Sequence, residues 1–142
     1  MSREQILAAI PHRPPMLLLD EVTHWEAERI VCNKTFQPDE WFFQGHYPSF
    51  PLVPGVILCE AAMQAGAVLL SQHAKGKGMP VVGRLNDVKF KRMVRPGESV
   101  QIEAKLDERM ADAFFLTAKV TCEGKLAVSL AFAVTLAKQE AP

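Results

Sequence analysis

The feature that most constrains the fold is the apolar stretch at residues 56–70, which carries Glu60 and Gln64 near its middle. It follows Pro54, a residue suited to a first helical turn because its missing N–H needs no partner there. The helix predicted over residues 55–73 is apolar on nearly every face, so it must be buried on all sides. At fewer than the ~20 residues of a bilayer span, it predicts no insertion into a membrane.

Alternating patterns surround this helix. Apolar and polar residues alternate over residues 100–106, 114–122 and 126–136, and turns are predicted at 95–98 and 123–124. This period indicates antiparallel strands with one buried face. Further elements are predicted elsewhere: a short helix capped by Ser2 at residues 2–9, and strands at 16–22, 29–36 and 81–91. We therefore expect an α+β fold, with an antiparallel sheet wrapped around one central helix in a single domain, residues 1–142.

Composition excludes several classes of protein. The formal net charge is zero, which argues against a nucleic-acid binder and favours association into a homo-oligomer. Three cysteines, Cys32, Cys59 and Cys122, are widely spaced and predict neither a disulfide framework nor a metal site. Cys59 adjoins Glu60 in the apolar stretch, where packing is a better explanation than a nucleophile. The N-terminal segment has no secretion signal, so we expect a cytoplasmic protein.

One polar constellation demands an explanation. Glu60 and Gln64 are four residues apart and share a face of the helix. Burying a charged carboxyl group in so apolar a segment costs on the order of several kcal/mol unless the group is paired or protonated. His46 precedes the helix in a loop, residues 37–54, whose aromatic side chains should pack against something. Gly55 begins the helix, where free N–H groups suit a developing oxyanion.

A base, an acid and an oxyanion donor suit the elimination of water next to a thioester carbonyl. Each residue also has a simpler explanation. His46 could be a structural or exposed loop histidine, and Glu60 could face a subunit interface. The other histidines show no partner pattern and are interpreted as structural or solvated: His12, His24 and His73.

Several motifs together resemble the FabZ-type 3-hydroxyacyl-[acyl-carrier-protein] dehydratases. They are FQGHYP at residues 43–48 with Pro51, PGV at 54–56, EA at 60–61 with Gln64, IPHRPPMLLLD at 10–20, DVKFKR at 87–92 and PGE at 96–98. The resemblance runs through nearly the whole chain. Glutamate at position 60, rather than aspartate, is typical of the FabZ type and not of the related FabA type, which also isomerises the double bond.

The resemblance implies a hot-dog fold and dehydration of (3R)-3-hydroxyacyl-ACP to trans-2-enoyl-ACP in fatty acid biosynthesis. It implies that His46 is the base, that Glu60 is the acid or orients a water, that the Gly55 N–H binds the carbonyl, and that Gln64 supports Glu60. The substrate would be carried on the phosphopantetheine of acyl carrier protein, with no metal or cofactor. His46 of one subunit would meet Glu60 of the other in a homodimer, assembled as a trimer of dimers.

Departures from the family pattern leave alternatives open. Ser49 and Phe50 stand where glycine and a variable residue are usual, Tyr47 replaces phenylalanine, and Met93 replaces proline. They could reshape the acyl tunnel, as in a specialised paralogue serving another lipid or polyketide-type pathway.

The rivals are a hot-dog thioesterase and a non-catalytic carrier-binding subunit. A local basic cluster is either a solvated strand face or a landing site for acidic carrier protein: Lys89, Lys91, Arg92 and Arg95.

Overall fold

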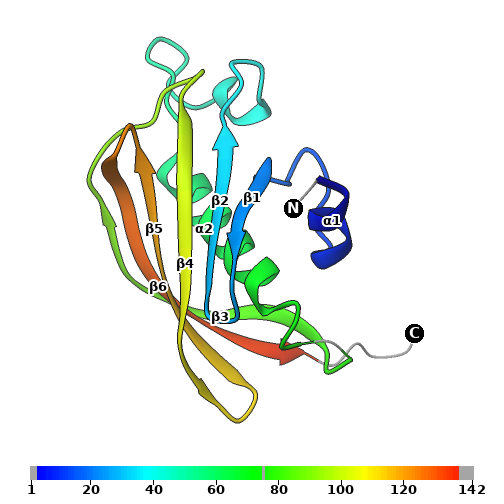
Figure 1. Cartoon of the computed structure of the whole chain (residues 1–142). Coiled ribbons are helices and arrows are strands. Elements are labelled where there is room, and N and C mark those ends of the chain that lie inside the picture. The colour runs from blue at the N-terminus through cyan, green and yellow to red at the C-terminus, as the bar shows by residue number, and fades with distance from the viewer. Residues whose placement is uncertain (1–2, 75, 138–142) are drawn as a thin grey trace.

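The computed structural model describes residues 3–74 and 76–137. Along the chain the elements are α1 (Arg3–Ala9), β1 (Glu21–Trp25), β2 (Arg29–Thr35), the short 3-10 helix η1 (Trp41–Phe43), α2 (Gly55–Leu70), β3 (Met79–Phe90), β4 (Ser99–Met110), β5 (Ala113–Cys122) and β6 (Lys125–Ala137). The six strands form one antiparallel sheet in the order β1-β2-β4-β5-β6-β3. In Figure 1 the sheet curves around α2, and α1 lies beside β1.

The central helix is buried as predicted, because five of the six strands contact it. Ala61, Ala62 and Ala65 have no exposed surface. A Cβ added at Gly66 would lie 2.7 Å from the Phe132 ring on β6, which is closer than side-chain carbons approach one another. Small residues on α2 therefore let the sheet pack tightly against it. This confirms the expected α+β architecture, a hot-dog fold.

The helix is shorter than predicted. It ends at Leu70, and the next residues close tighter turns: the Ser71 N–H bonds the Val68 carbonyl at 3.1 Å, and the His73 N–H bonds the Leu70 carbonyl at 2.9 Å. Such i to i−3 bonds are common where a helix finishes. Among the described residues, no helix has the length and apolar character to cross a bilayer.

The strands follow the alternating pattern with one adjustment. On β5 the buried residues are every second one from Phe114 to Cys122. On β6 the register shifts by one residue, because Val120 pairs with Val128 while Thr121 pairs with Leu126. The bulge turns Ala127 inward and leaves Leu126 only partly buried, whereas simple alternation predicted Leu126 on the buried face.

The strand predicted at residues 16–22 is wrong, since β1 begins only at Glu21. The preceding segment buries three consecutive leucines, Leu17–Leu19, so it has no two-sided strand pattern. Its backbone bonds elsewhere: the Leu18 N–H donates to the side chain of Gln64. The helix expected at residues 2–9 is present as α1, although Ser2, its predicted cap, lies outside the described residues.

Candidate active site

The loop before α2 is only partly packed. Phe42 and Phe43 are buried, with ring centroids 4.8 Å apart, and they anchor η1 to the core. Trp41, Tyr47 and Phe50, in contrast, are 47–64% exposed, so the expectation that the loop aromatics pack against something holds within this chain for only two of the five. A backbone bond of 2.8 Å from Val53 to the Val94 carbonyl ties the end of the loop to the segment after β3.

His46 is held with a defined ring orientation. Its Nδ1 lies 3.1 Å from the Leu52 carbonyl oxygen, which can only accept a hydrogen bond. We therefore assign the proton of the neutral imidazole to Nδ1, which leaves Nε2 unprotonated and able to accept a proton. The Tyr47 ring stacks edge-on at 4.7 Å, and Tyr47 itself has a φ of 52°, a left-handed conformation that is unusual for a non-glycine residue.

Gly55 begins α2 beside His46. Pro54 precedes it in an extended conformation, and the first N–H groups of the helix have no acceptor within the helix itself. A Cβ at Gly55 would lie 2.5 Å from the Cε1 atom of Phe90. The phenyl ring thus packs directly on the backbone at the start of the helix, where only glycine fits with Phe90 in this position.

His46 and Gly55 line the same cavity of about 740 Å³. Its walls are largely apolar and include Val56, Phe90 and Met93. Of the residues that depart from the family pattern, Met93 therefore shapes this cavity directly. Ser49 and Phe50 line neither this cavity nor a smaller one, of about 370 Å³, on the Trp41 side of His46.

Glu60 and Gln64 form a second group farther along α2. Gln64 is 1% exposed, and its Nε2 donates to Glu60 Oε2 at 2.9 Å and to the Met16 carbonyl at 2.9 Å. Its Oε1 accepts the Leu18 N–H at 2.8 Å. The two N–H donors and the oxygen of this amide are all hydrogen-bonded, so the side chain is fixed. The Glu60 side chain is 26% exposed, so the carboxyl group is partly rather than fully buried.

His12 also reaches this group, which the sequence did not predict. Its Nε2 lies 3.5 Å from Glu60 Oε2. The sequence showed no partner pattern for His12, and its interpretation as a structural or solvated histidine did not include this contact. The two residues are 48 apart in sequence, a separation at which no periodic pattern connects them. The available signal was its position in the IPHRPP segment, which belongs to the family-like motif.

His46 and Glu60 are not brought together within one chain. The two cavities of about 740 and 370 Å³ described above do not include Glu60. Glu60 lies five residues after Gly55, about 7.5 Å along the helix, and it contacts His12 and Gln64. The structure of the single chain thus holds two half-sites, one around His46 and Gly55 and the other around Glu60.

The four residues of the predicted basic cluster do not share the same neighbours. Arg92 pairs with Glu98 at 3.8 Å and with Glu123 at 3.4 Å, and Arg95 lies over the Phe50 ring. Lys91 and Arg92 both line the His46 cavity. Lys89 instead lines a different hollow, of about 460 Å³, over the outer face of the sheet.

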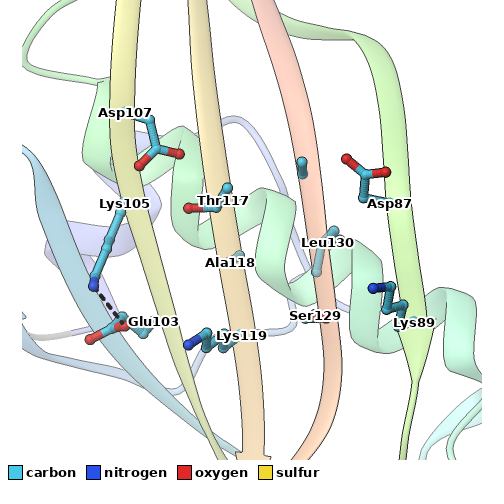
Figure 2. Close-up of a pocket in the computed structure, with 11 residues that line it drawn as sticks. Asp87, Lys89, Glu103, Lys105, Asp107, Thr117, Ala118, Lys119, Ser129 and Leu130 are labelled. Carbon is cyan, nitrogen blue, oxygen red and sulfur yellow. Dashed lines mark ion pairs between the residues drawn. The ribbon is translucent and has the colours of Figure 1, made fainter.

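Figure 2 shows that hollow, with Lys89 below Asp87 on β3 and Lys105 paired with Glu103 across the sheet on β4. Side chains of both signs line it, so this face offers no continuous positive surface. The four basic residues therefore do not form one patch.

The cysteines behave as packing residues. Cys32, Cys59 and Cys122 are all free and buried. Burial raises the pKa of the Cys32 thiol to about 12 and raises the pKa of Cys59 as well, which keeps both protonated and unreactive near neutrality. Within residues 3–74 and 76–137 no group of three or more potential metal-binding side chains occurs.

The model of the FabA-like domain matches residues 10–131. The chain belongs to the FabA-like family. It is 36% identical over 130 residues to the 3-hydroxyacyl-[acyl-carrier-protein] dehydratase FabZ of Clostridium perfringens, covering 91% of this chain and 94% of that protein. It is 39% identical over 131 residues to the FabZ dehydratase of Oenococcus oeni, with the same coverage.

Solved structures share the fold of this FabA-like protein. The dehydratase heterocomplex ApeI:P from Xenorhabdus doucetiae superposes with a TM-score of 0.77 over 94% of this chain and 91% of that one, at 18% identity. The PaaI protein of the E. coli phenylacetic acid degradation operon gives 0.67, at 12% identity and 81% coverage of each chain. At these identities the likeness shows the fold alone.

Proposed function

We propose that this protein dehydrates 3-hydroxyacyl thioesters carried on acyl carrier protein, giving trans-2-enoyl thioesters for fatty acid biosynthesis. The observation that carries the proposal is the cavity shared by His46 and Gly55, in a chain 36–39% identical to FabZ dehydratases along nine-tenths of its length. A base aimed into an apolar cavity beside a helix N-terminus suits removal of a proton next to a carbonyl group.

In the proposed reaction, Nε2 of His46 takes the α-proton of the substrate. The Gly55 N–H donates to the thioester carbonyl oxygen as negative charge develops there. The new Cα=Cβ double bond forms as the Cβ–O bond breaks, and Glu60 supplies the proton with which the hydroxyl group leaves as water. The proton on His46 then returns to Glu60 through solvent, so both groups are regenerated. These steps use protein groups only.

The two half-sites would be completed by a second copy of the chain. Three large apolar side chains that line the His46 cavity are 54–69% exposed: Val56, Phe90 and Met93. Among the described strands, β3 lies at one edge of the sheet and pairs only with β6. A homodimer formed along this side would cover the apolar surface and bring Glu60 of one subunit to His46 of the other. Association of such dimers into a trimer of dimers extends the same proposal.

The carrier protein is proposed to approach the mouth of the cavity. Lys91 is an exposed member of the basic set on the cavity wall, and Arg95, which lies over the Phe50 ring, is exposed as well. Arg92 is engaged with two glutamates, and Lys89 faces the outer sheet, so we expect these two to contribute less. Positive charge here would steer an acidic carrier without fixing its affinity. A cytoplasmic location fits this partner.

The test measures both possible products from a 3-hydroxyacyl thioester. We expect enoyl thioester with no release of free thiol, whereas thiol release without an enoyl product would indicate a thioesterase. His46→Ala and Glu60→Gln should each lower kcat by about 10²–10⁴-fold, the range for general acid–base groups.

The matched controls are His24→Ala and Glu108→Gln, at exposed positions on β1 and β4, and they should retain full activity. Full turnover in either active-site variant would contradict the mechanism.

A further inference from the structure

His12 is a polar side chain beside Glu60 that the proposed reaction does not use. Its Nε2 lies 3.5 Å from Glu60 Oε2, and the two side chains are 28% and 26% exposed. We propose that His12 is a positioning residue, which acts with Gln64 to hold one oxygen of Glu60 so that the other oxygen faces the substrate. This inference rests on the proposed catalytic role of Glu60.

The buried nitrogen of His12 indicates which one carries the proton. Its Nδ1 is buried and has no hydrogen-bond partner within the described part of the chain. A buried N–H without an acceptor is rarer in proteins than an acceptor without a donor. The neutral imidazole therefore keeps its proton on Nε2, the nitrogen that faces Glu60. The Nε2–H group of His12 thus faces Oε2 at 3.5 Å, which is longer than a normal hydrogen bond, so this is the weaker of the two contacts to that oxygen.

Gln64 donates to the same oxygen. Its amide cannot be turned around, because the Leu18 N–H can only donate to Oε1 and the Met16 carbonyl can only accept from Nε2. The Nε2 group is therefore the one that meets Glu60 Oε2, at 2.9 Å. Two side chains from distant parts of the chain, Gln64 on α2 and His12 in the N-terminal segment, therefore contact the same carboxyl oxygen of Glu60.

This convergence selects an orientation. The terminal torsion of a glutamate side chain is broad and nearly two-fold, so a carboxyl group without fixed partners presents either oxygen. Two donors on Oε2 remove that freedom and leave Oε1 for the leaving hydroxyl group or for a water. Preorganisation of this kind raises the rate of the chemical step and has little effect on substrate affinity.

His12 is itself held in place. Nη1 of Arg13 donates to the carbonyls of Ile10 and His12, at 2.9 and 2.7 Å, and so ties together the backbone on both sides of the imidazole. Ile10 is buried in the core. The donor therefore sits on a fixed segment rather than on a freely moving loop.

The test compares two amides that mimic the two nitrogens of histidine. Glutamine at position 12 places an N–H near the Nε2 position, whereas asparagine places it near Nδ1, which has no hydrogen-bond partner among residues 3–74 and 76–137. We expect His12→Asn to lower kcat about 3- to 10-fold, the effect of losing one ordinary polar contact to Glu60, with KM changed by less than about twofold. His12→Gln should recover most of that loss.

Both variants should melt close to the wild-type temperature. A simple structural role for His12 would not distinguish the two amides. Equal kcat values for His12→Asn and His12→Gln, whether high or low, would overturn the proposal, as would a loss confined to KM.

Glu60→Gln separates this inference from the function on which it depends. If Glu60 is the acid, Glu60→Gln alone removes most of the activity, and adding His12→Asn lowers the residual rate no further, because an absent acid cannot be positioned. Full activity in Glu60→Gln would refute the proposed function itself. Loss of activity in Glu60→Gln together with an unchanged kcat in His12→Asn would refute only the role of His12.

Discussion

The bonds of Gln64 predict a large effect on stability from a change of nearly constant volume. Gln64→Met keeps an unbranched side chain and a similar helix propensity, but it removes every hydrogen bond that the amide makes. The Leu18 N–H, which is fully buried, loses its acceptor, and the partly buried Met16 carbonyl loses its donor. The variant therefore tests whether this one side chain fastens the N-terminal segment to the central helix.

The expected loss of stability follows from the two backbone groups that lose their hydrogen-bond partner. An unsatisfied buried N–H costs about 1–3 kcal/mol, and a lost hydrogen bond to a partly solvated carbonyl costs about 0.5–1.5 kcal/mol. Together they predict a loss of about 1.5–4.5 kcal/mol in the free energy of unfolding. For a chain of this size, at about 3 °C per kcal/mol, the melting temperature should fall by about 4–14 °C.

Thermal unfolding followed by circular dichroism measures the fall in melting temperature. All variants are compared at one protein concentration, because association shifts the midpoint. Met63→Leu is the matched control, since it alters a neighbouring, partly buried position on α2 that makes no such bonds. It should melt within about 2 °C of the wild type. If Gln64→Met melted as the control does, the backbone bonds would not carry the stability assigned to them.

Two further substitutions, at Gly55 and at Cys32, have effects that the structure predicts. Gly55→Ala should push the half-exposed Phe90 ring outward, because the new Cβ would lie 2.5 Å from it. We expect kcat/KM for dehydration to fall at least about tenfold, with a change in the free energy of unfolding below about 1 kcal/mol. A wild-type rate in this variant would argue against carbonyl binding at the helix start. Burial raises the pKa of Cys32 from 9.0 to about 12, so the folded state holds this proton more tightly and stability should fall as the pH rises from about 9 toward 12. Urea unfolding at pH 8 and 10.5 should show a loss about 1–2 kcal/mol greater in the wild type than in Cys32→Val, and equal losses would refute the assignment.

Much of the architecture could be predicted because its signals are local. The apolar stretch with its small residues specified a buried helix, and the period of two specified strands with one buried face. The predictions that failed were those decided by distant partners. The segment before β1 is no strand because Gln64, from α2, takes up its backbone groups. The bulge that turns Ala127 inward depends on pairing with β5 and has no marker in the β6 sequence.

The candidate site divides in the same way. His46, Glu60 and Gly55 were identified by residue type, by the helix boundary and by the family-like motif, all of which are written along the chain. Tertiary structure decided that Leu52 orients the imidazole, that His12 reaches Glu60, and that the two halves of the site lie apart in one chain. Contacts across tens of residues depend on how the elements pack. A sequence can therefore state which groups are available for catalysis, whereas only the packed fold determines which of them meet.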